Sequence, residues 1–243
     1  MSLIGGIMGG FPDAPAGGLG EWVKLLAGDF NIVNTNEIDP WNDSVGNSNY
    51  GQTNSTFRPL NTETLNGKTV AVFNGSASRL EADNVVAVNL QAVTVVVLGK
   101  LDTNTQECIW AHRDSGNDLL QFYVNSGAML MQYRTDGTSL QQLTGATTVT
   151  TGAWHILSYI YDGSGVQKMR LDGVQDASAT VTMSGNLNSN TETIGCYRSG
   201  AIYSAFTDGA IADVRIFDSA LSDTDVAAAE TDINTDNGSP VTL

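Results

Sequence analysis

The sequence of 243 residues predicts an all-β fold in which two antiparallel sheets pack face to face. Two dipeptides, Asn66-Gly67 and Asp172-Gly173, are each flanked by β-type runs. They suit two-residue hairpins, because a type I′ turn needs the positive φ that Gly adopts freely.

The run from Val93 to Leu98 is apolar and β-branched without a break, which is typical of a strand buried on both faces, whereas Trp154 to Tyr161 partly alternates, as a half-buried strand does. Further turn signals lie at Asp114 to Gly116, Asp136-Gly137, Asp162 to Gly165 and Ser184-Gly185.

One helix is predicted near the C-terminus. Ser222 can cap the run from Asp223 to Glu230, with Asp225 near the position of the reciprocal acid of a capping box. A second helix could form from Glu21 to Ala27, but glycines bound this segment and it is too short to be stable without tertiary support. Its secondary structure therefore stays open.

The composition excludes some classes of partner. The formal charge is −15, from 26 acidic and 11 basic residues. Binding to a phosphate backbone needs Lys and Arg to displace counterions, so nucleic acid is not an expected partner. Membranes are not expected either, since anionic lipids would be repelled and no apolar stretch approaches the roughly 20 residues needed to span a bilayer. The two cysteines, Cys108 and Cys196, leave two alternatives open, which are one bridge between strands and two buried free thiols.

The N-terminus reads as a Gly/Pro-rich arm. It lacks the basic residues and the continuous apolar core of a secretory signal. Because its glycines cannot build a core, we expect the arm to gain order only against another surface. The side chains expected to make that contact are Leu3, Ile4, Ile7, Met8 and Phe11. The predicted organisation is an arm over residues 1–28, a sandwich over 29–230 and a tail over 231–243.

Several motifs follow one another in a recognisable order. They are Trp41 to Asn47, Arg58-Pro59, Leu65 to Gly75, Thr193 to Gly195, Phe206 to Phe217 and Ala220 to Ser222. This order resembles that of laminin-G-like domains of the concanavalin A-like lectin/glucanase superfamily, over roughly residues 29 to 230. The resemblance implies a jelly roll with Trp154 packed inside and a short helix after the last core strand.

No catalytic motif accompanies the resemblance. Glucanases with this jelly roll carry Glu-x-Asp-x-x-Glu on one strand, where the two carboxylates do the hydrolysis. The nearest segment here begins at Glu81 and has Val86 in place of the third acid. A Gly-x-Ser-x-Gly elbow and metal motifs of the Cys-x-x-Cys or His-Glu-x-x-His kind are also missing from the sequence. His155, directly after Trp154, matches a structural position of the family and is not expected to be catalytic. Because the sequence shows none of these catalytic motifs, we expect a protein without enzyme activity.

Calcium is the one candidate cofactor. The segment from Ile109 to Asp118 resembles a pentraxin hairpin that ends in an Asp-Asn ligand pair, although the order here is Asn-Asp. The loop that supplies further acids in pentraxins has Arg198 instead. Asp114 and Asp118 are thus weak calcium candidates, and the alternative is that both are turn residues, which Asp favours by bonding its own backbone.

Glycan recognition is expected from one predicted loop. Tyr197, Arg198, Tyr203 and Phe206 lie in or beside it, and Asn117 is a further candidate. Aromatic rings with Arg and Asn are the chemistry that stacks on sugars and bonds their hydroxyls. The alternative is that these aromatics complete the core or contact a neighbouring subunit.

Two functions are therefore considered. Laminin-G-like domains usually act outside cells, yet no secretory signal is recognised here. A phage virion protein would reconcile these observations, because it is made in the host cytoplasm and leaves by lysis. We expect a non-catalytic capsid decoration or head or tail appendage subunit on the virion surface, with copies of itself, other virion proteins and host-surface or environmental glycans as partners. The alternative is a free-standing carbohydrate-binding lectin.

Overall fold

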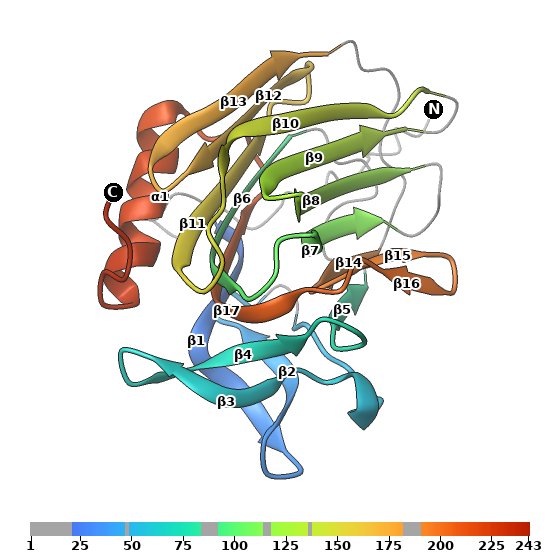
Figure 1. Ribbon diagram of the computed structural model, residues 1–243, viewed down its shortest axis with the longest axis vertical. Helices are drawn as coiled ribbons and strands as arrows, with labels where there is room; N and C mark the ends of the chain where they lie inside the picture. Colours follow the sequence, from blue (N-terminus) through green and yellow to red (C-terminus); the bar gives the residue numbers. More distant parts are fainter. Residues whose placement is uncertain (1–20, 47–48, 84–91, 114–117, 136–137, 182–190) are drawn as a thin grey trace, which may run out of the picture.

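The computed structural model describes residues 21–46, 49–83, 92–113, 118–135, 138–181 and 191–243, and it shows two antiparallel sheets packed into a sandwich (Figure 1). The nine-stranded sheet runs in space through β1 (Glu21–Val33), β2 (Glu37–Asp43), β3 (Leu60–Leu65), β4 (Lys68–Asn74), β17 (Asp208–Phe217), β6 (Val93–Leu101), β11 (Trp154–Tyr161), β12 (Val166–Leu171) and β13 (Val174–Thr180). The six-stranded sheet runs through β10 (Gln141–Thr148), β9 (Ala128–Arg134), β8 (Leu119–Asn125), β7 (Gln106–Arg113), β14 (Thr191–Ile194) and β5 (Leu80–Asp83). A hairpin of β15 (Tyr197–Ser199) and β16 (Ile202–Ser204), a 3-10 turn η1 (Ser55–Phe57) and the helix α1 (Asp223–Asp236) complete the described elements. The all-β sandwich with a C-terminal helix is confirmed.

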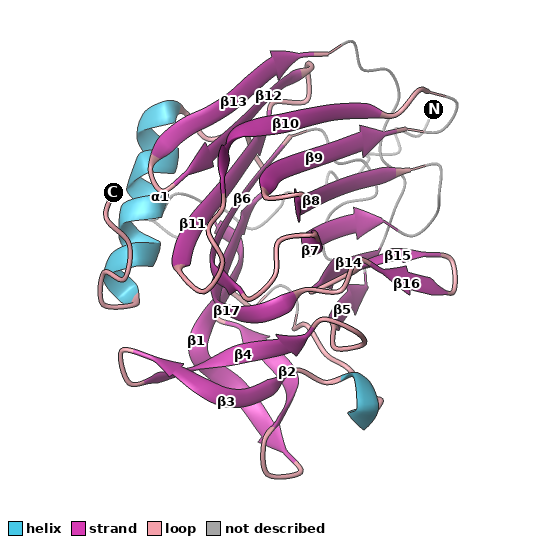
Figure 2. Ribbon diagram, in the orientation of Figure 1, coloured by secondary structure: helices cyan, strands magenta, loops and turns pink. Residues whose placement is uncertain are grey.

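β6 shows how the sandwich is layered. Val93, Val95 and Val97 point into the core between the sheets, and Val96 and Leu98 point to the outer face, where α1 packs. The prediction that this strand is buried on both faces is confirmed. Figure 2 shows α1 lying against the nine-stranded sheet. The helix therefore covers part of the outer face of this sheet and does not cover the outer face of the six-stranded sheet. Within the described residues, no helix has the length and apolar character needed to cross a membrane.

The predicted hairpin turns are present. Asn66 and Gly67 connect β3 to β4 with φ values of 49° and 83°, and Asp172 and Gly173 connect β12 to β13 with values of 50° and 81°. Both turns thus place two residues in the left-handed region, as a type I′ turn requires. In the turn at Asp162 to Gly165, the Asp162 carboxylate accepts hydrogen bonds from successive backbone N–H groups. The turn signals at 114–116, 136–137 and 184–185 lie outside the described residues.

The segment from Glu21 to Ala27 forms a strand and not a helix. β1 pairs with β17 on one side, with Val23 opposite Ile216 and Leu25 opposite Val214, and with β2 on the other. Val23 and Leu25 are fully buried in the core, so cross-strand pairing and burial outweigh local propensity. Because β1 begins at Glu21, the sandwich starts before residue 29, where the sequence placed the boundary. The predicted arm contacts at Leu3, Ile4, Ile7, Met8 and Phe11 lie outside the described residues.

The C-terminal helix is longer than predicted. Ser222 caps it, since its hydroxyl accepts a hydrogen bond from Asp225 N at 3.2 Å. Instead of ending near Glu230, the helix continues to Asp236, because Ile233 packs in the outer cluster and Asn234 exchanges two hydrogen bonds with the backbone of Val241. The predicted tail over 231–243 is therefore partly helical and partly fixed to α1.

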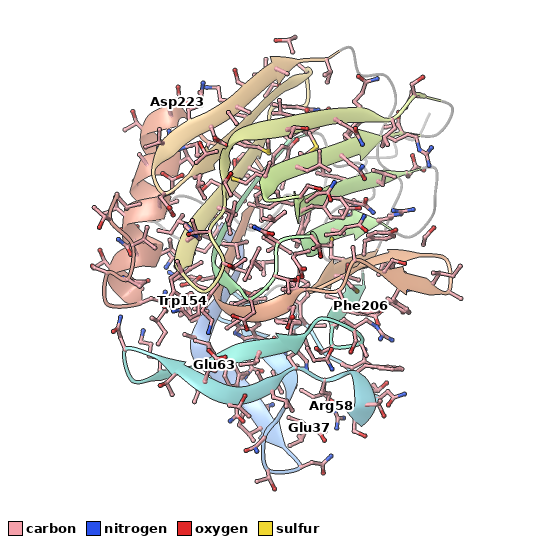
Figure 3. All side chains as sticks on the ribbon, in the orientation of Figure 1. Glu37, Arg58, Glu63, Trp154, Phe206 and Asp223 are labelled. Atoms are coloured by element: carbon pink, nitrogen blue, oxygen red, sulfur yellow. The ribbon has the colours of Figure 1, made fainter. Side chains whose placement is uncertain are left out.

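The position of Trp154 differs from the expectation. Its side chain does not lie between the sheets but is half-buried on the outer face of the nine-stranded sheet, with Ile156 and Ile160 of the same strand (Figure 3). The face is set by the alternation of β11, because Leu157 and Tyr159 occupy the inner side. His155 has a structural environment, as predicted: its Nδ1 lies 2.7 Å from Asp172 Oδ2 and its Nε2 lies 2.9 Å from Thr150 Oγ1.

This His155–Asp172 pair should make stability depend on pH. The hydrogen bond with Asp172 raises the pKa of His155, against the opposing effect of burial. A raised pKa in the folded state means that the stabilisation is complete below the unfolded pKa of about 6.5 and is lost as the pH rises through the folded value. Asp172→Asn keeps a residue that tolerates positive φ but removes the charge, so the loss of stability between about pH 5.5 and about pH 8.5 should become smaller than in the wild type.

Urea unfolding at the two pH values measures this difference. Asp162→Asn is the matched control, because it changes a similar turn aspartate that has no described histidine contact. An equal pH dependence in the wild type and in Asp172→Asn would contradict the assignment.

Both cysteines are buried free thiols. Burial raises the pKa of Cys196 to about 12 and raises that of Cys108 well above its ordinary value. Of the two alternatives left open by the sequence, the structure therefore shows the unbridged one, with thiols that are poor nucleophiles at neutral pH.

Candidate functional site

The outer face of the six-stranded sheet carries the candidate site. Residues of β5, β7 and β8 alternate between the core and this face, so Leu80 and Ala82 point inward while Glu81 points outward. The β15–β16 hairpin extends beside β14 and β5 (Figure 1), and its Tyr197 packs on a small outer cluster that includes Tyr123. This arrangement brings polar and aromatic side chains from distant parts of the chain together.

One part of the site is a guanidinium held between two aromatic rings. The Arg79 guanidinium carbon lies 4.2 Å from the centroid of Phe57, in η1, and 3.7 Å from that of Tyr203, in β16. We call these three residues the Arg79 stack. Arg79 is largely buried and Tyr203 is half-buried. The stack therefore fixes one side of the hairpin to the sandwich with a cation between two π faces.

Glu81 is held at the edge of the Arg79 stack. Its Oε1 accepts hydrogen bonds from Arg79 Nε at 3.0 Å and from Gln52 Nε2 at 3.3 Å, and its Oε2 accepts one from the Tyr203 hydroxyl at 2.9 Å. Burial, followed by this hydrogen bond with Glu81, raises the pKa of Tyr203. At neutral pH the tyrosine is thus a neutral donor and the glutamate an oriented acceptor.

Arg198 extends from the same face of the hairpin. It pairs with Tyr203 across β15 and β16, so the two side chains share a side. Its Nε donates to Gly200 O at 2.8 Å, and its Nη1 lies 3.8 Å from Glu81 Oε2. The side chain is 31% exposed, so it is partly open to solvent.

A second pair of an arginine and an aromatic ring joins β7 to the other face of the hairpin. The Arg113 guanidinium is 4.4 Å from the centroid of Tyr197, whose ring meets Tyr123 edge to face. The carboxamide of Gln121, with its oxygen toward Arg113, accepts from Arg113 Nε at 3.2 Å and donates to Gln132 at 3.2 Å. We call Arg113, Tyr197, Tyr123 and Gln121 the Arg113 cluster. Because Gln121 is fully buried, it orients the guanidinium against the ring.

A buried carboxylate lies on the inner side of β14. Glu192 accepts hydrogen bonds from the Tyr50 hydroxyl and from Trp110 Nε1, the latter at 3.3 Å, and its other oxygen is 3.4 Å from His112 Nδ1. Burial raises the pKa of Tyr50 well above its ordinary value, so this donor stays protonated. The group is closed off from the outer face and supports β14, beside which the hairpin lies.

The structure unites most of the predicted site. Tyr197, Arg198 and Tyr203 come together on the hairpin, although the two tyrosines serve different faces of it. Phe206 is half-buried near its base (Figure 3). Asn117 and Asp114 lie outside the described residues. Asp118 is half-buried at the start of β8, and the part of the chain that the structure describes holds no group of three His, Cys, Asp or Glu side chains suited to a metal.

Sequence reasoning missed Phe57, Arg79, Arg113 and Gln121, and considered Glu81 only as part of a failed catalytic motif. One signal was available for two of them. In the run from Arg79 to Ala82, charged and apolar residues alternate, which places Arg79 and Glu81 on the solvent face of a strand. The contacts of Arg79 and Arg113 with the hairpin carry no such signal, because more than 80 residues separate each arginine from its tyrosine, and Phe57 joins the group through Arg79.

Comparison with models of known protein families shows to which family the chain belongs. A family model described as concanavalin A-like lectin/glucanases superfamily, of the laminin G type, matches residues 74–227. The chain belongs to this superfamily. The match extends from β5 to the first turn of α1. It includes the Arg113 cluster and all of the Arg79 stack except Phe57. No curated protein sequence shows significant similarity to the chain.

Solved structures with the superfamily's jelly roll resemble the chain in fold. The CBM40 of a Ruminococcus gnavus IT-sialidase bound to α2,3-sialyllactose has a TM-score of 0.51 at 18% identity, covering 58% of this chain and 83% of that one. The binding domain of botulinum neurotoxin serotype D/C has a TM-score of 0.61 at 13% identity, covering 88% and 52%. NanB sialidase from Streptococcus pneumoniae has a TM-score of 0.53 at 18% identity, covering 65% of this chain. The chain spans only 27% of that sialidase.

Proposed function

We propose that this protein is a carbohydrate-binding module that holds glycans on the outer face of its six-stranded sheet and does not hydrolyse them. The observation that carries the proposal is the Arg79 stack with Glu81 and Arg198 at its exposed edge. A rigid ring beside an oriented acceptor and a solvent-facing donor is the chemistry that recognises a sugar, whose C–H face is apolar and whose rim is hydroxyl.

The site is organised before a ligand arrives. Tyr203 is fixed by Arg79 and by its hydrogen bond to Glu81, and Tyr197 is fixed by Arg113 and Tyr123. Ordering these side chains costs little on binding, because their rotamers are already set. The CBM40 with sialyllactose supports the proposal in general terms, since a domain of similar fold holds an oligosaccharide.

The absence of hydrolysis is proposed from the state of Glu81. Its carboxylate already accepts hydrogen bonds from Arg79, Gln52 and Tyr203, so it is engaged as a structural acceptor and not free to act as an acid or nucleophile. Incubation with polysaccharides that bind should release no reducing ends. Release above a denatured control, lost in Glu81→Gln, would refute this part of the proposal.

A glycan array tests binding directly. The wild type should bind a subset of glycans, and the double variant Arg198→Ala/Tyr203→Ala should lose them. Lys168→Ala is the matched control, because Lys168 pairs with Asp223 of α1 on the opposite side of the molecule. Retention of the same glycans by the double variant would show that the site lies elsewhere.

We propose, as a second candidate function, a structural subunit on a phage virion surface, and the N-terminal arm is the observation that favours it. Residues 1–20 combine seven glycines with a few large apolar side chains, a composition suited to docking along a neighbouring subunit. The two functions are compatible, since a subunit anchored by its arm could present the glycan site outward.

Deletion of residues 1–20 checks this second candidate. Because β1 begins at Glu21, the truncation leaves every strand of the described residues intact, and the melting temperature should change little. Oligomerisation or attachment to particles should be lost, because burial of the five apolar side chains could contribute on the order of 7 to 15 kcal/mol before ordering costs. Full assembly of the truncated protein in analytical ultracentrifugation would rule out the anchoring role.

A further inference from the structure

We infer that the glycan held on this face is anionic and carries carboxylate or sulfate groups. The inference rests on the proposed function and names the class of ligand for the same site. It comes from the local charge, from the donors that Arg198 leaves unused and from the register of the arginines on the sheet.

The local charge is opposite to that of the whole chain. The Arg79 stack with its edge and the Arg113 cluster contain three guanidinium groups, Arg79, Arg113 and Arg198, against one carboxylate, Glu81. These four groups therefore sum to +2, three positive minus one negative, whereas the chain has a formal charge of −15. Three of only 11 basic residues lie within this site. Such a concentration favours a ligand of negative charge at contact.

Arg198 is the residue best placed to make the charged contact. Arg79 is already bound to Glu81 at 3.0 Å, whereas Arg198, among the described residues, makes a short hydrogen bond only through its Nε, to Gly200 O at 2.8 Å. Its Nη1 is 3.8 Å from Glu81, beyond hydrogen-bonding distance. The planar fork of a guanidinium matches the two oxygens of a carboxylate or sulfate, which a sugar hydroxyl cannot offer.

The sheet extends this cationic character beyond the hairpin. Arg113 and Arg134 flank Leu119 in register across β7, β8 and β9, which separates them by two strand spacings, on the order of 10 Å. Arg134 Nε is buried and has no hydrogen-bond partner among the described residues. A buried donor of this kind is costly unless a ligand or water satisfies it. The row of arginines suits an anionic chain of more than one sugar.

Matched pairs of glycans test the inference. The probes are oligosaccharides of uronic acids with their carboxyl-reduced forms, and sulfated oligosaccharides with their desulfated forms, each titrated by calorimetry at low and at high salt. At least one acidic member should bind about ten-fold more tightly than its neutral partner, and the preference should shrink at high salt. The pair that shows it distinguishes carboxylate from sulfate recognition.

Variants at Arg198 connect the preference to this site. Arg198→Gln should abolish the preference for the acidic member, and Arg198→Lys should retain part of it, while Lys168→Gln on the far side should change nothing. If neutral and acidic members bind equally and Tyr203→Ala still abolishes binding, the inference is wrong and the proposed function stands. If no member of any pair binds, the inference is wrong, while the glycan array still decides the proposed function.

Discussion

Replacement of Glu230 by alanine is expected to lower the free energy of unfolding by about 3 kcal/mol or more. Glu230 lies in α1, is 1% exposed, and accepts hydrogen bonds from Ser158 Oγ at 2.8 Å and from Arg170 Nε and Nη2 at 2.9 Å each. These bonds join the helix to β11 and β12. Their removal leaves the Arg170 guanidinium largely buried without its carboxylate, and an uncompensated buried charge is the costly outcome.

Chemical denaturation of two helix variants measures the effect. Asp232→Ala removes an acid from the same helix at an exposed position and should change stability by less than about 0.5 kcal/mol. Similar losses in Glu230→Ala and Asp232→Ala would mean that the buried contacts do not hold the helix in place.

Replacement of Arg79 by lysine is expected to weaken glycan binding by more than about ten-fold. Lysine keeps the charge but cannot fill the space between the Phe57 and Tyr203 rings with a planar group. Each ring contact is worth roughly 1 kcal/mol, so the hairpin should loosen and Tyr203 and Arg198 should lose their common orientation. Binding, measured by calorimetry with a glycan selected on the array, should fall while the melting temperature falls only slightly.

Arg170→Lys is the control for this change. Arg170 lies in β12 and pairs with Glu230 of α1 at 2.9 Å, on the opposite side of the molecule from the Arg79 stack. It should show a comparable loss of stability with unchanged binding. If both arginine variants bind as the wild type does, the stack is a structural clamp without a role in recognition.

Much of the fold could be predicted from the sequence because its signals are local. The Asn66-Gly67 and Asp172-Gly173 turns, the doubly buried β6 and the Ser222 cap each depend on a few neighbouring residues. The exceptions depend on distant partners. Glu21 to Ala27 becomes a strand through β17, nearly 200 residues away, and α1 is extended by contacts of Ile233 and Asn234 that no local pattern shows.

Only the residues of the candidate site that are close together in the sequence were predicted. Tyr197, Arg198 and Tyr203 are close in sequence and were recognised together, whereas their partners come from η1, β5, β7 and β8. Trp154 shows the related difficulty of assigning a face. The sequence predicted a half-buried strand here, but β11 is buried on both faces from Ile156 to Tyr161, so alternation alone does not reveal which side meets the other sheet. Contacts between distant parts of the chain therefore determine both the composition of the candidate site and the face of β11 on which Trp154 lies.

A crystal structure of the protein with a glycan selected on the array shows directly whether the outer face of the six-stranded sheet binds sugar. We expect sugar density on this face, within contact of the Tyr203 ring and within hydrogen-bonding distance of Arg198. Density confined to another surface, such as α1 and the nine-stranded sheet beneath it, would contradict the proposed binding site.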